Sequence, residues 1–161
     1  MQSFKIIKPI HILTPYVRYY WILEDGADVS VSERTLPTGC IQLVFHRGKR
    51  LLLVGKKESQ PQAFICGQCL NFSDVMSAGK IEMITVVFQP YAARAILQLP
   101  LKFFYGELIA VDAIADLKLS ILSRKVIEAD DHETCIRLIE LFLIHRIYRF
   151  EGSEYNLKRI S

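Results

Sequence analysis

Short runs of apolar and β-branched residues, separated by turn-forming residues, fill the first ninety positions of the chain. The run at 16–23 ends at Glu24-Asp25-Gly26, and Leu36-Pro37-Thr38-Gly39 marks a second turn, because proline presets φ and glycine tolerates a positive φ. This spacing is typical of a small all-β sandwich or barrel. The predicted strands are 16–23, 40–46, 50–54, 63–67, 72–76 and 81–88, with 40–46 and 50–54 paired as a hairpin.

A helical pattern replaces the strands after Gln89-Pro90. Aspartate at 112 is placed to cap one helix, and the acidic run 130–133 lies where the dipole of the next helix favours negative charge. Basic residues near Arg149 suit the negative end of that last helix. The predicted helices are 91–97, which stops before Pro100, a second near 114–125 with Asp112 as its cap, and a third at 133–149.

Strands first and helices last indicate one α+β domain. We expect this domain to span 1–150, with a β part at 1–90 and a helical part at 91–150, followed by a linker or tail at 151–161. The 161 residues are 51% hydrophobic and 23% charged, which is the composition of a single domain with its own core. A core of this size needs no disulfides, so we expect the four cysteines to be reduced, as in the cytoplasm.

The charge balance argues against nucleic-acid binding by this chain. Ten basic residues face seven acidic ones in 1–90, and ten face ten in 91–161, so neither half is strongly basic. Affinity for nucleic acid comes largely from neutralising phosphates, which requires a concentrated basic face. The chain also has no apolar run of the ~18–20 residues that would span a bilayer and no secretory signal at its start, so we expect a cytoplasmic protein without membrane contact.

The predicted helix 133–149 is too apolar for packing on one side only. An amphipathic helix needs an apolar stripe about 100° wide, whereas ten of these seventeen residues are apolar. The favoured interpretation is that one stripe packs on the strands and another on the same helix of a second chain, which makes a homodimer with an isologous contact. The alternative is a helix buried on most sides in its own domain. The predicted interface residues are Ile136, Ile139, Leu143 and Ile147.

No motif in the chain supports catalysis or metal binding. Cys66-Gly67-Gln68-Cys69 has the spacing of redox and zinc sites, but no helix pattern follows it and no further ligands stand at a recognisable spacing. The four histidines, at 11, 46, 132 and 145, form no close pair. Nucleophile elbows, phosphate loops and dinucleotide fingerprints are also missing. We therefore expect no catalytic residue, no metal and no cofactor.

A small-molecule pocket is the remaining site hypothesis. Gln42 and His46 lie on one face of the strand 40–46 and could project into a barrel interior as hydrogen-bonding groups. The alternative is that this face is a solvent-exposed edge. Aromatic residues at 16, 19, 20 and 21 could line the same pocket, although aromatic residues in strands more often belong to a core. The predicted ligand-binding residues are Trp21, Gln42 and His46.

Four short motifs follow one another along the chain. They are a Tyr-Trp strand at 16–21, a Pro-x-Gly turn before an apolar strand at 36–45, a Gly-Gln step at 67–68, and a Phe-x-Pro step into a helix at 84–93. In order and spacing, from about residue 9 to residue 125, they resemble the N-terminal domain of AraC-type bacterial transcriptional regulators. The family pattern falls on Trp21, Pro37, Gly39, Gly67, Gln68 and Pro90, mainly as fold-defining residues.

The resemblance implies a cupin-like β-barrel followed by helices, which senses a small effector and dimerises. In that family DNA is contacted by a C-terminal pair of helix-turn-helix units, which would need roughly 100 further residues. We therefore expect DNA binding only through a domain outside this chain. Two alternatives stay open: a stand-alone cupin-type enzyme, such as an isomerase or small oxygenase, and a ligand-free oligomerisation module.

Overall fold

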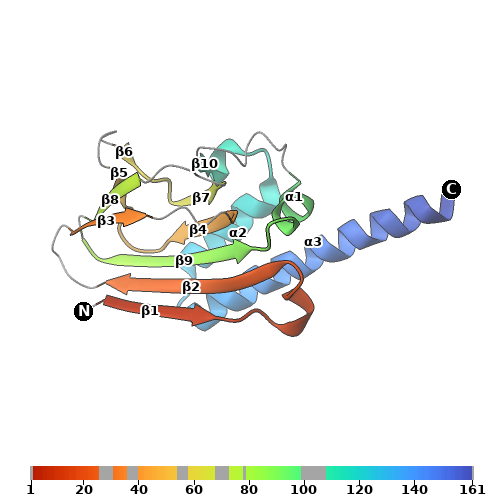
Figure 1. Ribbon diagram of the computed structural model, residues 1–161, viewed down its shortest axis with the longest axis horizontal. Helices are drawn as coiled ribbons and strands as arrows, with labels where there is room; N and C mark the ends of the chain where they lie inside the picture. Colours follow the sequence, from red (N-terminus) through yellow and green to blue (C-terminus); the bar gives the residue numbers. More distant parts are fainter. Residues whose placement is uncertain are drawn as a thin grey trace.

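The structure, a computed structural model, places the strands first and most of the helical residues last (Figure 1). The predicted α+β class is therefore confirmed. One short strand, β10, interrupts the helical part between α1 and α2. The structure describes residues 2–25, 31–35, 40–53, 58–67, 73–77, 79–98 and 108–160.

A six-stranded sheet forms the centre of the molecule, with every neighbouring pair of strands antiparallel. Its order is β1-β2-β9-β4-β7-β10, and β1 and β10 are its two edges. The sheet is therefore open, which differs from a closed barrel. Its strands are β1 (Gln2–Ile7), β2 (Val17–Asp25), β4 (Gln42–His46), β7 (Ala63–Cys66), β9 (Ile81–Phe88) and β10 (Leu108–Ala110).

A smaller four-stranded sheet has the order β3-β8-β5-β6 and lies at one end of the molecule, on the left in Figure 1. Two of its strands have only two residues each. Short strands of this kind carry little hydrophobic pattern, so they are hard to find in a sequence. The strands are β3 (Val31–Thr35), β5 (Leu52–Leu53), β6 (Glu58–Ser59) and β8 (Ser73–Ser77).

The predicted hairpin between 40–46 and 50–54 is wrong. Strand β4 pairs with β7 and β9, whereas β5 pairs with β6 and β8 in the smaller sheet. The reason is the segment after β4: the N–H groups of Arg47 and Gly48 donate to Glu82 O, and that of Lys49 donates to Lys80 O. These bonds hold the segment against the start of β9. The chain then enters the smaller sheet and does not fold back on β4.

The α-helices are α1 (Ala92–Leu97), α2 (Leu117–Glu128) and α3 (His132–Ile160). Two one-turn 3₁₀ helices are η1 (His11–Leu13) and η3 (Val111–Ala113). Asp112 lies in η3, so the prediction that it caps the second helix is wrong. Asp116 is the cap, because its side chain accepts from Leu119 N. The expected acidic start of the third helix is confirmed, since Asp131 Oδ1 accepts from Thr134 N at 2.7 Å.

Helix α3 is longer than the sequence pattern indicated. It continues past Arg149 to Ile160, and this C-terminal part projects away from the sheets (Figure 1). The added segment contains no proline, and Glu, Leu, Lys and Arg within it favour helices. A polar composition, which suggested a tail, is equally compatible with a helix surrounded by solvent.

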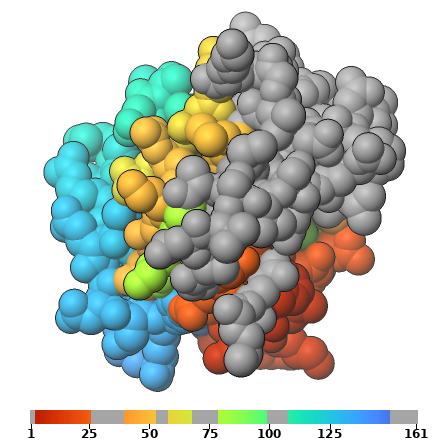
Figure 2. Space-filling view, turned by 90° about the vertical axis from the view of Figure 1, so that its left-hand side faces the viewer, coloured from red at the N-terminus to blue at the C-terminus, as the bar shows by residue number. Residues whose placement is uncertain are grey.

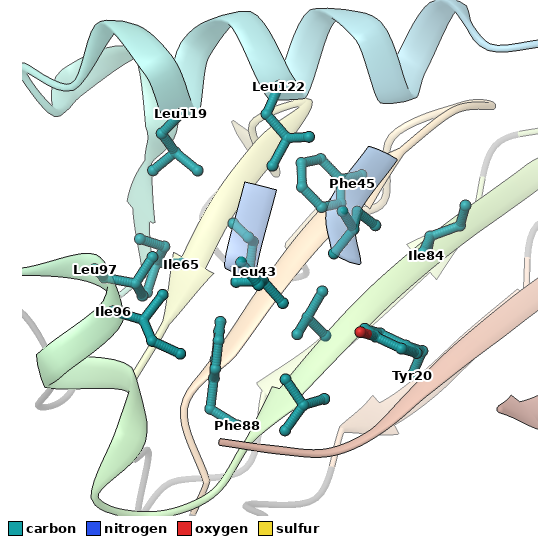
Figure 3. Close-up of a cluster of buried hydrophobic side chains, with 14 of the residues drawn as sticks. Tyr20, Leu43, Phe45, Ile65, Ile84, Phe88, Ile96, Leu97, Leu119 and Leu122 are labelled. Carbon is teal, nitrogen blue, oxygen red and sulfur yellow. The ribbon is translucent and has the colours of Figure 1, made fainter. Parts of the chain in front are cut away.

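The main core lies between the six-stranded sheet and the helices. Leu119 and Leu122 of α2 point toward Leu43 and Phe45 of β4 (Figure 3). Side chains alternate along a strand, so every second residue of β4 from Leu43 and of β9 from Ile84 belongs to this core, whereas β2 alternates only after the register shift between Val17 and Tyr19. The fully buried residues on this face of the sheet are Tyr20, Leu43, Phe45, Ile65, Ile84, Val86 and Phe88.

Candidate functional site

The three residues predicted to bind a ligand lie on one face of the large sheet, the face opposite the helices. The strand register places Trp21 beside Thr85 and places Thr85 beside Val44. Gln42 and His46 flank Val44 on the same face, because side chains alternate along a strand. Directly opposite residues have Cβ atoms about 4.5–5.5 Å apart, and diagonal neighbours are about 7–8 Å apart. Trp21, Gln42 and His46 therefore surround Thr85. We call these four residues the Thr85 cluster.

His46 is fully buried, so the alternative of a solvent-exposed edge is wrong. Its Nε2 lies 2.8 Å from Gln60 Oε1, and its ring lies 5.8 Å from the ring of Phe64. The amide oxygen of Gln60 can only accept, so Nε2 carries the proton in this bond. Burial lowers the pKa of His46, against the opposing effect of the Gln60 bond. The imidazole is therefore neutral, with an acceptor lone pair at Nδ1.

Two buried polar atoms of the Thr85 cluster have no hydrogen-bond partner within the described part of the chain: His46 Nδ1 and Thr85 Oγ1. Leaving such atoms unpaired in a folded protein is costly, and each one calls for an explanation. Trp21 is half-buried, and its ring lies 5.8 Å from that of Phe4. His46 and Thr85 have no exposed surface, so these two atoms are the unexplained polar groups of this face.

The aromatic residues at 16–21 do not form one patch. Tyr20 is fully buried on the helix-facing side, where its hydroxyl donates to Glu140 Oε2 on α3 at 3.0 Å. The same carboxylate oxygen accepts from Ile10 N at 3.0 Å. Burial and the nearby Glu140 carboxylate raise the pKa of Tyr20. Tyr20 therefore belongs to the core and links β2 to α3, whereas its neighbour Trp21 belongs to the opposite face.

Three of the four residues predicted for a dimer contact are buried inside the domain itself. Ile139 and Leu143 have no exposed surface, and Ile147 is 6% exposed. The physical reason is that α3 packs against α1, α2 and η1 and lies over the sheet, which gives it more neighbours than the sequence suggested. Only Ile136 is partly exposed. In the described part of α3, the exposed large apolar residues are Leu141 and Tyr148, which are 61% and 64% exposed.

A groove of about 470 Å³ runs between the β1–β2 edge of the sheet and α3. Its wall is mainly aliphatic and includes two exposed apolar residues, Ile10 just before η1 and Leu141 of α3. The half-buried Ile136 lies in this wall together with Leu141 and Ile144. The residues that line the groove are Lys5, Ile7, Ile10, Ile22, His132, Glu133, Ile136, Arg137, Glu140, Leu141 and Ile144.

Several polar side chains lie together at one end of the large sheet, on its helix-facing side. Glu24 and Glu82 are register partners on β2 and β9, and His132 begins α3. His132 Nε2 lies 2.7 Å from Glu24 Oε1 and 2.8 Å from Glu82 Oε1. Arg47 Nη1 lies 2.9 Å from Glu82 Oε1, and Arg47 Nη2 donates to Ala129 O. Figure 2 faces this end of the molecule, where the blue and turquoise helices adjoin the orange and green strands.

Sequence reasoning missed Thr85, Gln60, Glu24, Glu82 and His132 as site residues. Each is far from its partners along the chain, so no local spacing could reveal them. For Thr85 a signal did exist, because it is the one hydroxyl in the otherwise apolar run 83–88. A polar residue inside a buried strand marks either a hydrogen bond or a site.

The cysteine motif gains no support as a redox or metal site. Cys66 is half-buried on β7, and Cys69 lies outside the described residues, as do Pro37, Gly39 and Gln68 of the family pattern. Cys135 is fully buried, and its Sγ donates to Val126 O at 3.3 Å. Burial raises the pKa of Cys135, which disfavours the reactive thiolate. Cys135 therefore acts as a packing residue.

The fold and the clusters define an α+β domain with an open antiparallel sheet and C-terminal helices. Residues 5–110 match the family described as Domain of unknown function (DUF6597), and the chain belongs to this family. Searches of curated proteins and of solved structures found no significant match. Among the described helices, none is both long enough and apolar enough to cross a membrane.

Proposed function

We propose that this chain is the effector-sensing and dimerisation domain of an AraC-type transcriptional regulator, with DNA binding supplied by a separate domain. The observation that carries the sensing role is the Thr85 cluster, which has two unpaired polar atoms on a buried sheet face. The four motifs that resemble those of AraC-type regulators are the reason for proposing a regulatory context. The near-neutral charge fits a domain that does not itself contact phosphates.

The cluster favours a small, uncharged, polar effector. A neutral His46 in an apolar environment offers an acceptor at Nδ1, and Thr85 Oγ1 can donate or accept. A charged ligand would lose its hydration on entering this face without gaining an opposite charge, because the Thr85 cluster contains no ionised side chain. The half-buried indole of Trp21 adds an apolar contact surface.

Strand β2 supplies the physical connection between the effector and α3. Trp21 lies on the effector face of β2, and the adjacent Tyr20 lies on the other face, where its hydroxyl holds Glu140 of α3. A ligand that displaces β2 would therefore act on the Tyr20–Glu140 bond. Such a ligand shifts the position of α3 only if it binds two arrangements of the domain with different affinities.

Self-association has its own support in the exposed side of α3. Leu141, Ile144 and Tyr148 follow the spacing of three and then four residues that places side chains along one seam of a helix. Leu141 and Tyr148 are the large exposed apolar residues of the described part of this helix. Two copies of α3 could pack along these seams in a two-fold contact.

The sensing role is tested by screening ligands and then measuring their affinity. Purified protein is heated with a panel of nucleobases, sugars and primary amides, and any compound that raises the melting temperature is titrated by calorimetry. We expect a hit to bind with a stoichiometry of one, and the variants Thr85→Val and Gln42→Leu to bind it about tenfold more weakly, the cost of one hydrogen bond.

Thr14→Val is the matched control, because Thr14 is exposed and its hydroxyl donates to His11 O outside the cluster. Its affinity should equal that of the wild type. Equal affinities in Thr85→Val and the wild type would contradict the assigned site. A panel without any hit would favour the ligand-free oligomerisation module.

The dimer role is tested by sedimentation. Leu141→Glu and Tyr148→Glu place charges on the exposed seam without touching the core, so we expect folded monomers from a dimeric wild type. Arg149→Glu changes the charge of an exposed neighbouring position and serves as the control. An unchanged dimer mass in the seam variants would contradict this interface.

A further inference from the structure

At the polar end of the helix-facing side, three atoms that can act as metal ligands lie close together. Glu24 Oε1 and Glu82 Oε1 both lie within 2.8 Å of the same nitrogen, His132 Nε2. The separation of the two carboxylates is set by the sheet, because Glu24 and Glu82 are register partners on adjacent strands. Three separate elements, β2, β9 and α3, therefore bring one nitrogen and two oxygens to one point.

One proton has to serve two acceptors in this arrangement. An imidazole nitrogen carries at most one proton, so the N–H at Nε2 is shared in a bifurcated bond between oxygens at 2.7 and 2.8 Å, and such a bond is less linear than two separate ones. A metal ion in place of that proton would accept the lone pair of Nε2 and one from each carboxylate. One imidazole and two carboxylates are a donor set that divalent transition metals use, and zinc binds both ligand types at about 2.0–2.2 Å.

We propose that Glu24, Glu82 and His132 bind a divalent transition-metal ion, for which zinc is the probe. The three ligand atoms lie within 4.8 Å of one another, so shifts of well under an ångström per side chain would open the space for the ion. Their side chains are 48%, 32% and 28% exposed, respectively. This exposure gives the ion a path from solvent and leaves room for water as a further ligand.

Arg47 lies beside one of the three ligands, and its positive charge limits the affinity of the site for a cation. Its side chain is 8% exposed, and its Nη1 lies 2.9 Å from Glu82 Oε1 as an ion pair without hydrogen-bond geometry. Groups in this outer position help to hold the ligands in many metal sites. The guanidinium also cancels one of the two carboxylate charges, so it repels a cation. We therefore expect zinc affinity in the micromolar range, weaker than that of a closed structural site.

Occupancy of this site would fix the position of α3. His132 is the first residue of α3, whereas Glu24 and Glu82 belong to the sheet, so the ion would join the helix to the strands. The site lies on the helix-facing side, and the Thr85 cluster lies on the opposite face. The proposed metal site is therefore separate from the proposed effector site. An experiment can contradict one of the two proposals without contradicting the other.

Zinc titration into the metal-free protein tests the site. The 161-residue chain is treated with EDTA, dialysed and titrated with zinc chloride in a calorimeter. We expect one ion per chain in the wild type and a loss of affinity of at least about 100-fold in His132→Asn and Glu24→Gln, more than removal of an outer donor costs. Zinc should also raise the melting temperature of the wild type and leave that of His132→Asn unchanged.

His145→Asn and His11→Asn are the matched controls, because both histidines are exposed and stand outside the cluster. They should bind zinc like the wild type. Absence of zinc binding by the wild type, or wild-type affinity in both ligand variants, would overturn the proposal. If circular dichroism shows that His132→Asn does not fold, Glu24→Gln decides the question, since its side chain is half exposed and keeps its size.

Discussion

The two faces of the six-stranded sheet differ in how their polar groups are satisfied. On the helix-facing side, Tyr20 bonds to Glu140, and Arg146 of α3 binds both oxygens of Asp116 at 2.7 and 2.6 Å. On the opposite face, Thr85 Oγ1 and His46 Nδ1 are buried without a partner in the described chain. On the helix-facing side, unpaired buried atoms of the described chain lie at the polar end, where Arg47 Nε and Nη1 make no hydrogen bond. Paired polar groups contribute to stability, whereas unpaired neutral groups on a buried face reduce stability and are available to a ligand.

The largest expected effect is the loss of a large side chain from the helix-facing core. Phe45 has no exposed surface and packs between the sheet and α2 (Figure 3). Phe45→Ala should lower the free energy of unfolding by about 3–5 kcal/mol, because a cavity is added to the lost burial. Urea unfolding followed by circular dichroism measures this change. A loss below 1 kcal/mol would mean that this face is not the main core.

Breaking the ion pair on the helix-facing side should have the next largest effect. Arg146→Ala leaves the carboxylate of Asp116, 19% exposed, without its cation, and we expect a loss of about 2–4 kcal/mol at pH 7. Arg146 also donates to Ile96 O and lies over the Phe142 ring, 4.8 Å from its centroid. Arg146→Lys is the control, because it keeps the positive charge but not the bidentate geometry. It should recover only part of the unfolding free energy that Arg146→Ala loses.

The stabilisation by the Arg146–Asp116 ion pair should decrease as pH falls. Burial alone would raise the pKa of Asp116, but the Arg146 guanidinium and the Leu119 N–H outweigh it, so the folded pKa is lowered. The stabilisation is therefore fully present above the ordinary pKa of an aspartic acid and is lost as pH falls through the lowered folded value. The difference between wild type and Arg146→Ala should narrow at acidic pH. A constant difference between pH 7 and pH 3 would contradict this cause.

His46, on the face opposite the helices, should make the free energy of unfolding depend on pH. Its folded pKa is lowered by burial, so the unfolded chain takes up the proton first when pH falls below about 6.5. Stability then decreases with falling pH, by at most about 1.4 kcal/mol per pH unit. His46→Gln should remove this slope in urea unfolding between pH 7 and pH 5. An unchanged slope in the variant would assign it to another group.

Removing the unpaired hydroxyl should have the smallest effect and the opposite sign. Thr85→Val exchanges Oγ1, which has no partner in the described chain, for a methyl group of similar size. We expect the free energy of unfolding to rise by about 0.5–1 kcal/mol, since an unsatisfied buried group is removed. A loss of stability on Thr85→Val would show that the hydroxyl is hydrogen-bonded in the folded protein.

Much of the β-rich half could be predicted from sequence, because alternation and turn residues are local signals. The strand 81–88 has the predicted bounds, whereas β1 was missed, since Phe4 and Ile6 are exposed on an edge strand. The pairing of β5 was wrong because the backbone bonds of Arg47 and Gly48 to β9 depend on a distant segment.

Site residues were predictable only where they lie close together on one strand. Gln42 and His46 share a face of β4 by simple alternation, and their role in ligand binding stays a prediction. Glu24, Glu82 and His132 come together only through strand pairing and the position of α3. The dimer residues were misplaced because apolar periodicity does not distinguish an interface from a helix's own core.

The emission of Trp21, the single tryptophan of the chain, tests the central claim most directly. The claim is that the face opposite the helices binds the effector, and Trp21 lies on that face beside Thr85. A compound that raises the melting temperature should also change the Trp21 emission saturably, with the same affinity as in calorimetry. A compound that binds and stabilises the protein but leaves the Trp21 emission unchanged would contradict the claim and place the effector elsewhere.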